Sequence, residues 1–435
     1  MPSRTPIRTP FENVIVWGIR VASLGLLMVS PLAAQNDVGG VRQESRLARG
    51  PSRVVNRSAA IVVSPEAARI HQSSYVWDGH NDLPWMLRDK WDSSFDRADI
   101  SQPQPLLMTD IPRLRQGNVG AQFWSVFVPA KRGIDGTALQ TTIEQIEIVR
   151  QMCRRYPEIF AWTESIEQLE AARREGKIAS LIGVEGGHSI ENSLANLRRL
   201  HNLGARYMTL THSLSLDWAD SATDEPRSGG LSPFGEEVVR EMNRLGMLVD
   251  LSHVSPETMR QAIRISRVPV IYSHSSARAI ADHPRNVPDD ILPLIKANGG
   301  VIMVNFFSAF VVDAEAQKIR RRAAQSRQLE KDGVADEEIK ARQARWEIED
   351  PLQPGTIHDV IDHLDHLVEH CGIDHVGLGS DYDGVSIVPK QLEDVSTYPR
   401  ITQALLDRGY TAAEIQKILS GNIERVFRAA QEGRE

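Results

Sequence analysis

The segment IASLIGVEGGHSIENSLANLRRLHNLGARYMTLTH, residues 178–212, decides the fold class. It begins with the apolar run IASLIGVE (178–185) and ends with a second run, YMTLTH (207–212). Apolar residues recur between them at helical spacing, namely Ile190, Leu194, Leu197 and Leu200, and Gly204 follows as a helix stop. This order of strand, helix and strand predicts one βα unit of a parallel sheet.

Six further apolar or β-branched runs alternate with segments long enough for helices. They are YVWD (75–78), AQFWSVFV (121–128), GMLVDLSH (246–253), VPVIYSH (268–274), GVIMVNFF (300–307) and HVGLGSD (375–381). Together with the first two runs they predict an α/β fold, a closed (β/α)₈ barrel of the TIM type. An open doubly wound sheet is the alternative. That fold commonly has a Gly-rich phosphate loop after its first strand, where this chain has HNDLPW (80–85).

Composition limits the possible partners. A chain of 435 residues with 41% hydrophobic residues can form either one elaborated barrel domain or two to three ordinary domains. The net charge of −7 and the spread of Lys and Arg along the chain give no basic stripe, so nucleic acid is not expected as a partner. Cys153 and Cys371 lie in no CxxC or Cys/His cluster and are expected to be buried free thiols.

The first residues have the composition of an export signal. Arg4 and Arg8 precede the apolar stretch from Val21 to Ala34, which predicts that residues 1–34 are a secretory signal peptide. Cleavage after Ala34 and retention as an N-terminal anchor both stay open, because Leu32 is larger than the usual residue at that position. We expect an exported protein, periplasmic or secreted. Residues 35–58 are predicted to be a flexible linker, followed by a barrel domain over residues 59–435 with no transmembrane segment.

A charged insertion over residues 308–355 follows the seventh predicted strand. Its mixed charges and few large apolar residues favour a solvated pair of helices. Because the insertion follows a strand, it is expected to rise from the catalytic rim of the barrel, where a lid or a subunit contact is the alternative.

Metal-ligand residue types gather at the carboxyl ends of the predicted strands. They are His80 and Asp82 after the first, Glu185 at the third, His212 at the fourth, His253 after the fifth, His274 at the sixth and Asp381 at the eighth. In a closed barrel these ends converge on one rim, which is where barrel enzymes keep their active sites. Histidine nitrogens and carboxylate oxygens are ligands that zinc takes, and a carboxylate can bridge two ions.

Several motifs resemble those of a known family. DGHNDLPW, GVEGGHSI, LTHS, DLSHVS, SHSSAR, RNVPDD, MVNFF and GLGSDYDGV follow one another as in the membrane (renal) dipeptidase family, peptidase M19, from about Tyr75 to the C-terminus. The resemblance implies a barrel of the binuclear metallohydrolase kind with two zinc ions per chain. It assigns His80 and Asp82 to one ion, His253 and His274 to the other, and Glu185 to both. It also implies that His212 contacts the substrate carbonyl, Arg285 holds the substrate carboxylate and Asp381 transfers protons.

The implied activity is hydrolysis of dipeptides to free amino acids by a hydroxide that bridges the two zinc ions. Tolerance of a D-residue at the carboxyl side, and a homodimer, are implied by the resemblance alone. The alternative enzyme is another binuclear barrel amidohydrolase acting on cyclic amides, lactones or esters. Such enzymes often have HxH on the first strand and a modified lysine as the bridge, whereas this chain has HxD and Glu185. A zinc-binding module without catalysis would be expected to lose His212, Arg285 or Asp381, and all three are present.

The sequence also departs from the family pattern. Leu214 lies where animal members have a disulfide cysteine, so Cys153 is not expected to have that partner. Phe310 lies where some members have a tyrosine that helps to hold the substrate carboxylate, which leaves more of that task to Arg285. The C-terminal sequence RAAQEGRE is not the hydrophobic tail that a lipid anchor needs, so no GPI anchor is expected.

Overall fold

The computed structural model describes Arg57 and residues 59–434. The predicted signal peptide, residues 1–34, and nearly all of the predicted linker lie outside the described residues. Within the described part of the chain, no helix has both the length and the apolar character needed to cross a lipid bilayer.

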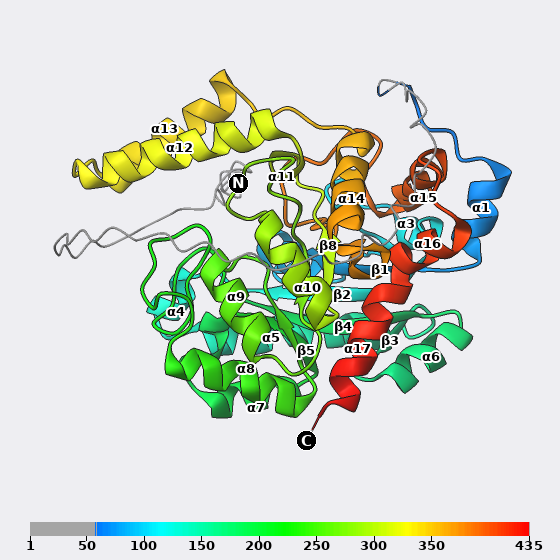
Figure 1. Ribbon diagram of the computed structural model, residues 1–435, viewed down its shortest axis with the longest axis horizontal. Helices are drawn as coiled ribbons and strands as arrows, with labels where there is room; N and C mark the ends of the chain where they lie inside the picture. Colours follow the sequence, from blue (N-terminus) through cyan, green and yellow to red (C-terminus); the bar gives the residue numbers. More distant parts are fainter. Residues whose placement is uncertain (1–56, 58, 435) are drawn as a thin grey trace, which may run out of the picture.

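Eight parallel strands close into a barrel, as predicted (Figure 1). The strands are β1 (Val76–Asn81), β2 (Val119–Phe127), β4 (Ile178–Glu185), β5 (Ala205–Thr209), β6 (Leu248–Asp250), β7 (Ile271–Tyr272), β8 (Val301–Val304) and β9 (Val376–Leu378). Each pairs with the next, and β9 pairs with β1 to close the ring. The carboxyl ends of all eight strands therefore lie at one rim.

A ninth strand, β3 (Phe160–Trp162), was not predicted. It pairs with residues 178–180 of β4, and β5 pairs with residues 182–185 of the same strand. Since β2 runs along the other edge of β4, β3 and β5 occupy successive parts of one edge. The barrel thus keeps eight strands, and β3 adds a short extension at the end opposite the rim.

About half of the described α-helices begin at a residue whose side chain caps the helix. The α-helices are α1 (Pro65–Gln72), α2 (Leu83–Trp91), α3 (Ile111–Gln116), α4 (Lys131–Ile134), α5 (Ala138–Arg155), α6 (Ile166–Arg174), α7 (Leu194–Asn202), α8 (Pro233–Leu245), α9 (Pro256–Ile265), α10 (Leu292–Asn298), α11 (Ser308–Val311), α12 (Asp313–Lys331), α13 (Asp336–Glu349), α14 (Ile357–Cys371), α15 (Tyr398–Asp407), α16 (Ala412–Gln416) and α17 (Asn422–Glu432). The helix expected over 189–204 begins only at Leu194, because Ser193 caps it and residues 187–190 form a 3₁₀ turn instead.

Side chains of alternate strand residues pack into two different hydrophobic cores. Trp77 and Phe123 belong to an inner cluster, whereas their neighbours Val76 and Trp124 belong to a larger cluster that includes the surrounding helices. α17 contributes Phe427 to the inner cluster, with its ring 5.7 Å from that of Trp77 and 6.3 Å from that of Phe123. Cys153 and Cys371 are buried free thiols, as expected.

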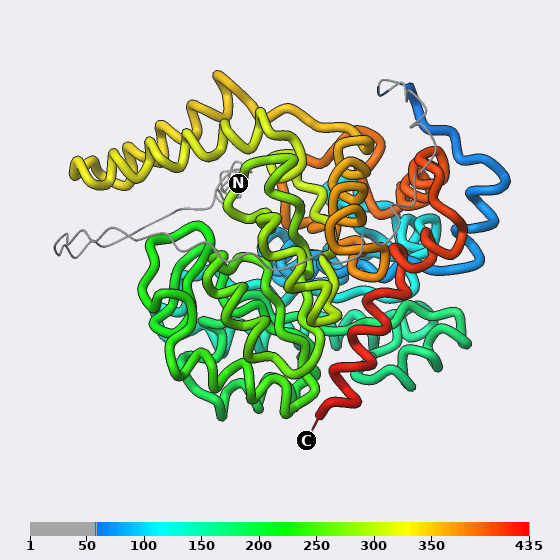
Figure 2. Tube along the Cα trace, in the orientation of Figure 1, coloured from blue at the N-terminus to red at the C-terminus, as the bar shows by residue number. Residues whose placement is uncertain are grey.

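The charged insertion contains α12 and α13, which form an antiparallel pair that projects from the body (Figures 1 and 2). Only Glu315, Ala316 and Ser326 of α12 and Ile339 of α13 are buried. The base of the pair is fastened by Lys318, whose ammonium lies 3.1 Å from Glu315 and 3.0 Å from Asp350. Most side chains of α12 and α13 are therefore at least partly exposed, and polar contacts such as those of Lys318 connect the two helices.

Candidate metal centre and active site

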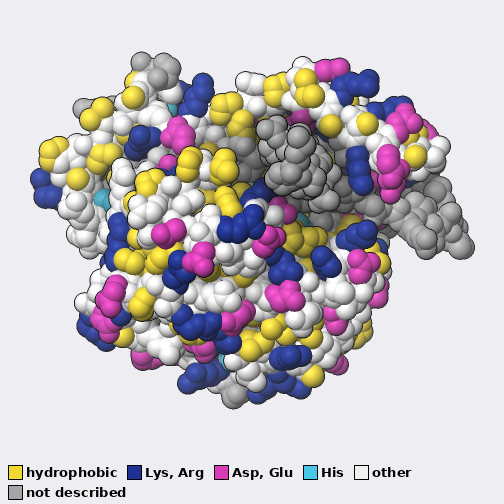
Figure 3. Space-filling view, turned by 180° about the vertical axis from the view of Figure 1, so that it is seen from behind, with side chains coloured by type: hydrophobic (Ala, Val, Ile, Leu, Met, Phe, Trp, Pro, Cys, Tyr) yellow, Lys and Arg dark blue, Asp and Glu magenta, His cyan; other side chains and the backbone are white. Residues whose placement is uncertain are grey.

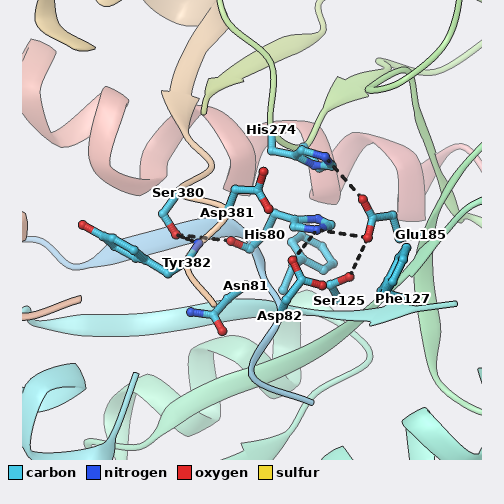
Figure 4. Close-up of polar contacts among 12 residues, drawn as sticks. His80, Asn81, Asp82, Ser125, Phe127, Glu185, His274, Ser380, Asp381 and Tyr382 are labelled. Atoms are coloured by element: carbon cyan, nitrogen blue, oxygen red, sulfur yellow. Dashed lines mark hydrogen bonds and ion pairs between the residues drawn. The ribbon is translucent and has the colours of Figure 1, made fainter. Parts of the chain in front are cut away.

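The predicted ligands all lie at the rim, but several lie beyond the strands. Figure 4 shows how the side chains of His80, Asp82, Glu185 and His274 converge. Glu185 ends β4, as predicted, whereas His80, predicted to follow the first strand, lies within β1, which extends to Asn81. By contrast His212, His253, His274 and Asp381 follow β5, β6, β7 and β9 by two or three residues, so the predicted runs overestimate the length of these strands. These four ligands lie in turns or irregular segments that follow the strands, and His253 has a left-handed φ of 69°.

Glu185 is the centre of the cluster. Its Oε1 lies 3.1 Å from His253 Nε2, 3.5 Å from His274 Nε2 and 3.6 Å from His212 Nε2. Its Oε2 faces the other side, 3.5 Å from His80 Nε2. The two oxygens of the Glu185 carboxylate thus face two different sets of metal-donor side chains.

The two sets have the composition of a binuclear metal centre. His80, Asp82 and Asp381 have donor atoms within 4.8 Å of one another on one side, and Glu185, His212 and His253 do so on the other. A third group, His80, Glu185 and His274, lies between them. His80 Nε2 and Asp82 Oδ1 are buried without a hydrogen bond, and a buried polar atom without a partner is costly. A cation between these donors would remove that cost, so the residues present fit two ions that share Glu185.

The pKa shifts within the cluster also favour the binding of cations there. Despite burial, which opposes both shifts, the pKa of His80 is raised by the neighbouring Tyr207, Glu185 and Asp82, and the pKa of Glu185 is held well below its usual value by His80. Both shifts favour a positive charge between Glu185 and Asp82, which a bound cation would supply. Burial lowers the pKa of His253 and His274 well below the usual value, so both are neutral and can act as ligands.

Hydrogen bonds from behind orient two of the histidines. His80 Nδ1 lies 2.8 Å from Tyr207 Oη, and His274 Nδ1 lies 2.7 Å from Ser273 Oγ. Ser273 in turn donates its hydroxyl to Asp250 Oδ2 at 2.6 Å. These contacts turn each Nε2 towards the centre, in the manner of the outer shell of known metal sites.

Asp78 and Asp250 play matching parts on opposite sides of the barrel. Asp78 accepts hydrogen bonds from the backbone N–H and hydroxyl of Ser380 at 2.8 and 2.6 Å, and Ser380 directly precedes Asp381. Asp250 accepts from the backbone N–H and hydroxyl of Ser273, which directly precedes His274. Neither carboxylate was predicted as a functional residue. Their signal was a charged residue within a buried apolar strand, in DGH and in DLSH.

Asp381 lies beside the cluster in a strained backbone position. Its φ is 64°, a left-handed value that is uncommon outside glycine and that gathers at functional sites. Asn305 donates to its Oδ2 at 2.7 Å, and burial raises the pKa of Asp381 to about 8. This carboxyl group is therefore poised to exchange a proton near neutral pH.

Arg285 is buried beside the cluster, and no carboxylate of the described residues pairs with it. Its guanidinium donates to Ser275 Oγ at 3.4 Å and to the backbone oxygen of His274 at 3.3 Å, and it lies over the ring of Phe310 at 5.3 Å. The nearby carboxylates of Asp289 and Asp290 are directed at His366 and Arg260 instead. An unpaired buried cation of this kind fits an anionic ligand.

The sequence matches the model of the membrane dipeptidase family, peptidase family M19, over residues 65–435. This chain belongs to that family. It is 40% identical over 363 residues to dipeptidase 3 of Mus musculus, which covers 82% of this chain but only 65% of that protein. The chain thus spans less than two thirds of the length of this relative.

Two solved structures show the same fold as this M19 chain. The probable dipeptidase PvdM from Pseudomonas aeruginosa has a TM-score of 0.75 at 24% identity, with 85% of this chain and 98% of that chain covered. A metallo peptidase from Rhodobacter sphaeroides, solved with a phosphinate mimic of the dipeptide L-Ala-D-Ala, has a TM-score of 0.68 at 21% identity, with 82% and 99% covered. The expected barrel and the resemblance to family M19 are both confirmed.

Proposed function

We propose that this chain is a zinc-dependent dipeptidase that hydrolyses dipeptides to free amino acids. The observation that carries the proposal is a carboxylate, Glu185, shared by two sets of metal donors beside the unpaired guanidinium of Arg285. Membership of the M19 family supports the same conclusion. His80 and Asp82 would hold one zinc ion, and His253 and His274 the other.

The metal centre and the protein would divide the chemistry. When bound, two zinc ions polarise the scissile carbonyl and activate the water that attacks it. Asp381 accepts a proton from that water and passes it to the leaving amine, which suits a carboxyl group whose pKa is about 8 in the metal-free chain.

His212 would stabilise the charge that develops on the carbonyl oxygen. Burial lowers the pKa of His212 to about 4, so its imidazole is neutral at pH 7 and one ring nitrogen carries a proton to donate. Loss of one such donor in other hydrolases costs about 3–4 kcal/mol of transition-state stabilisation.

Arg285 would select the substrate by its length. Its planar guanidinium suits two parallel hydrogen bonds to a free carboxylate. Because the guanidinium of Arg285 contacts the backbone of the ligand His274, we expect that carboxylate to lie one residue beyond the scissile bond. The same contact is available to either configuration at the last residue, so we also propose tolerance of a C-terminal D-residue. The alternative substrates, cyclic amides, lactones and simple esters, lack the carboxylate.

Export and assembly remain proposals that rest on the sequence. The order of charged, apolar and polar residues in 1–34 supports a periplasmic or secreted enzyme, with or without a retained anchor. A homodimer is proposed from the family resemblance.

The proposal is tested by comparing substrates that differ only in the carboxylate. Zinc-loaded protein should hydrolyse a dipeptide, should act far more slowly on the same dipeptide with a C-terminal amide, and should lose activity with a chelator. Arg285→Lys should raise KM for the dipeptide by roughly 10- to 100-fold, because an ammonium cannot form the two parallel bonds. The same variant should change the rate on the amide little. Turnover of lactones without turnover of dipeptides would instead establish the alternative enzyme.

A further inference from the structure

A second kind of metal-donor cluster lies away from the rim. Asp289, His366 and His370 have donor atoms within 4.8 Å of one another, and none of them belongs to the groups around Glu185. His366 and His370 come from α14, and Asp289 begins the short 3₁₀ turn of residues 289–291 that leads into α10. α14 and α10 lie side by side on the outside of the barrel (Figure 1).

The two histidines are four residues apart on one helix, so their side chains share a face. Their rings are stacked with centroids 4.0 Å apart and an angle of 26° between the planes. This spacing is the one by which helices present two imidazoles to a single ion.

The local hydrogen bonds already orient His370. Its Nδ1 lies 2.8 Å from the backbone oxygen of His366, and a carbonyl oxygen can only accept, so Nδ1 carries the proton. In the neutral ring, Nε2 therefore has a free lone pair, and His370 is exposed. This state of the ring is the one that binds a metal ion.

Asp289 supplies the oxygen donor. Its Oδ1 accepts a hydrogen bond from His366 Nε2 at 2.9 Å, so an ion that binds this nitrogen displaces its proton to solvent. The side chains of Asp289 and His366 are 42% and 14% exposed, so solvent ions can reach the cluster. The next residue, Asp290, is engaged by Arg260. The carboxylate of Asp289 is therefore the one directed at α14.

We propose that Asp289, His366 and His370 form a peripheral binding site for a divalent cation of the zinc class, separate from the two-ion centre in the barrel. Two imidazole nitrogens and one carboxylate oxygen match zinc, with water in the fourth position. Two ligands each about 2.0 Å from a tetrahedral ion lie about 3.3 Å apart. Asp289 Oδ1 and His366 Nε2, now 2.9 Å apart, therefore need to separate slightly, and the His370 ring needs to approach them. Rotation of the exposed His370 side chain can supply that movement.

Binding at this site would cross-link two elements. The ion joins α14 to the turn before α10, and that turn lies four residues after Arg285 in the chain. An ion bound only to the folded chain stabilises it, so its occupancy should raise the melting temperature.

The test compares the full-length protein with Asp289→Asn and His370→Gln by equilibrium dialysis against Zn²⁺ and by thermal unfolding. Wild type should bind one ion more per chain than either variant, or bind that ion about 10- to 100-fold more tightly. Added Zn²⁺, after the barrel ions are in place, should raise the melting temperature of wild type but not of the variants. Both substituted side chains are at least partly exposed, so both variants should fold.

His201→Gln is the matched control, because His201 lies on a surface helix and belongs to none of the donor groups formed by the described residues. It should behave as wild type does. Equal uptake by wild type, Asp289→Asn and His370→Gln would overturn the proposal, and so would an equal loss in His201→Gln. Since none of these measurements uses catalysis, their result does not depend on the proposed peptidase activity.

Discussion

Asp381 differs from the other carboxylates at the rim in the proton that it can hold. Burial raises the pKa of Asp381 to about 8, whereas His80 and its neighbours hold the pKa of Glu185 well below its usual value. Glu185 thus stays ionised and can bind cations, whereas Asp381 can gain and lose a proton near neutral pH. This separation of two acidic groups by their surroundings is a common basis for assigning ligand and acid–base roles.

Asp381→Asn tests that assignment. The amide is nearly isosteric but cannot take a proton, so turnover should fall by a factor on the order of 10²–10⁴. Both ions should remain, because the main donors are elsewhere. Zinc content and kcat should be measured on the same preparation. If zinc content falls and added zinc restores the rate, Asp381 acts chiefly as a ligand.

The hydrogen bonds behind His274 lead to a second prediction. In Asp250→Asn the amide presents N–H groups to Ser273, which loses one of its acceptors, and the orientation of His274 is loosened. Affinity for one of the two ions should therefore fall by about 10- to 100-fold. The measurement is a zinc titration of the metal-free protein. Excess zinc should recover much of the activity, which a damaged fold would not allow.

The sequence was enough to predict some residues of the site but not others. The strand-end rule was enough to gather His80, Glu185 and His253, because a closed barrel brings every carboxyl end to one rim. It could not identify Asp250 or Tyr207 as orienting residues. Their roles depend on which neighbouring strand faces them, and that pairing is not visible in local sequence.

At the scale of elements, the strands β5 to β9 are shorter than their apolar runs, whereas β1, β2 and β4 are not. β7 has only two residues although the run VPVIYSH extends over seven. Apolar character predicts burial, and residues such as Val270 and Leu251 are buried without being in a strand. The three-residue strand β3 was missed for the opposite reason, since it is too short to show any periodicity.

The helices α7 and α8 are joined by a polar contact whose effect on stability should depend on pH. Glu241 of α8 accepts hydrogen bonds from Arg198 of α7 at 2.7 Å and from Arg244. The hydrogen bond from Arg244, helped by that from Arg198, lowers the pKa of Glu241 from 4.5 to about 2 in the folded chain. A lowered pKa in the folded state means that this stabilisation is present above pH 4.5 and is lost as the pH falls towards about 2.

Glu241→Gln should therefore lower the free energy of unfolding near pH 7 by about 1 kcal/mol, a value kept small because both arginines are half-exposed. The difference from wild type should shrink when urea unfolding is repeated at about pH 3. A difference that is equal at both values would mean that packing, and not charge, accounts for the effect.

The whole molecule combines a closed barrel with a projecting arm, the helix pair α12 and α13. On the face shown in Figure 3, cationic and anionic side chains are interspersed. The sequence predicted the barrel because eight runs and their connections fit only a few topologies. It could not predict the direction of α12 and α13, which is set by contacts at the base of the arm. Whether the arm acts as a lid or as a subunit contact stays a prediction.

The barrel should keep its fold without its ions. Its strands pair around the complete ring, and its two hydrophobic cores are made by side chains outside the donor clusters. The ions bind the native state, so each site should still contribute about 4 kcal/mol at a free zinc concentration a thousandfold above its dissociation constant.

Chelation should thus lower the melting temperature substantially while the circular dichroism spectrum below that temperature stays native. The measurement is best made on His370→Gln, so that the proposed peripheral ion adds nothing to the shift. Returning zinc should restore both the melting temperature and activity. If the chelated protein instead loses its native spectrum at room temperature, the ions are needed to fold the rim. In that case the contacts of His80 with Glu185 and Asp82 are not enough to hold the three side chains together.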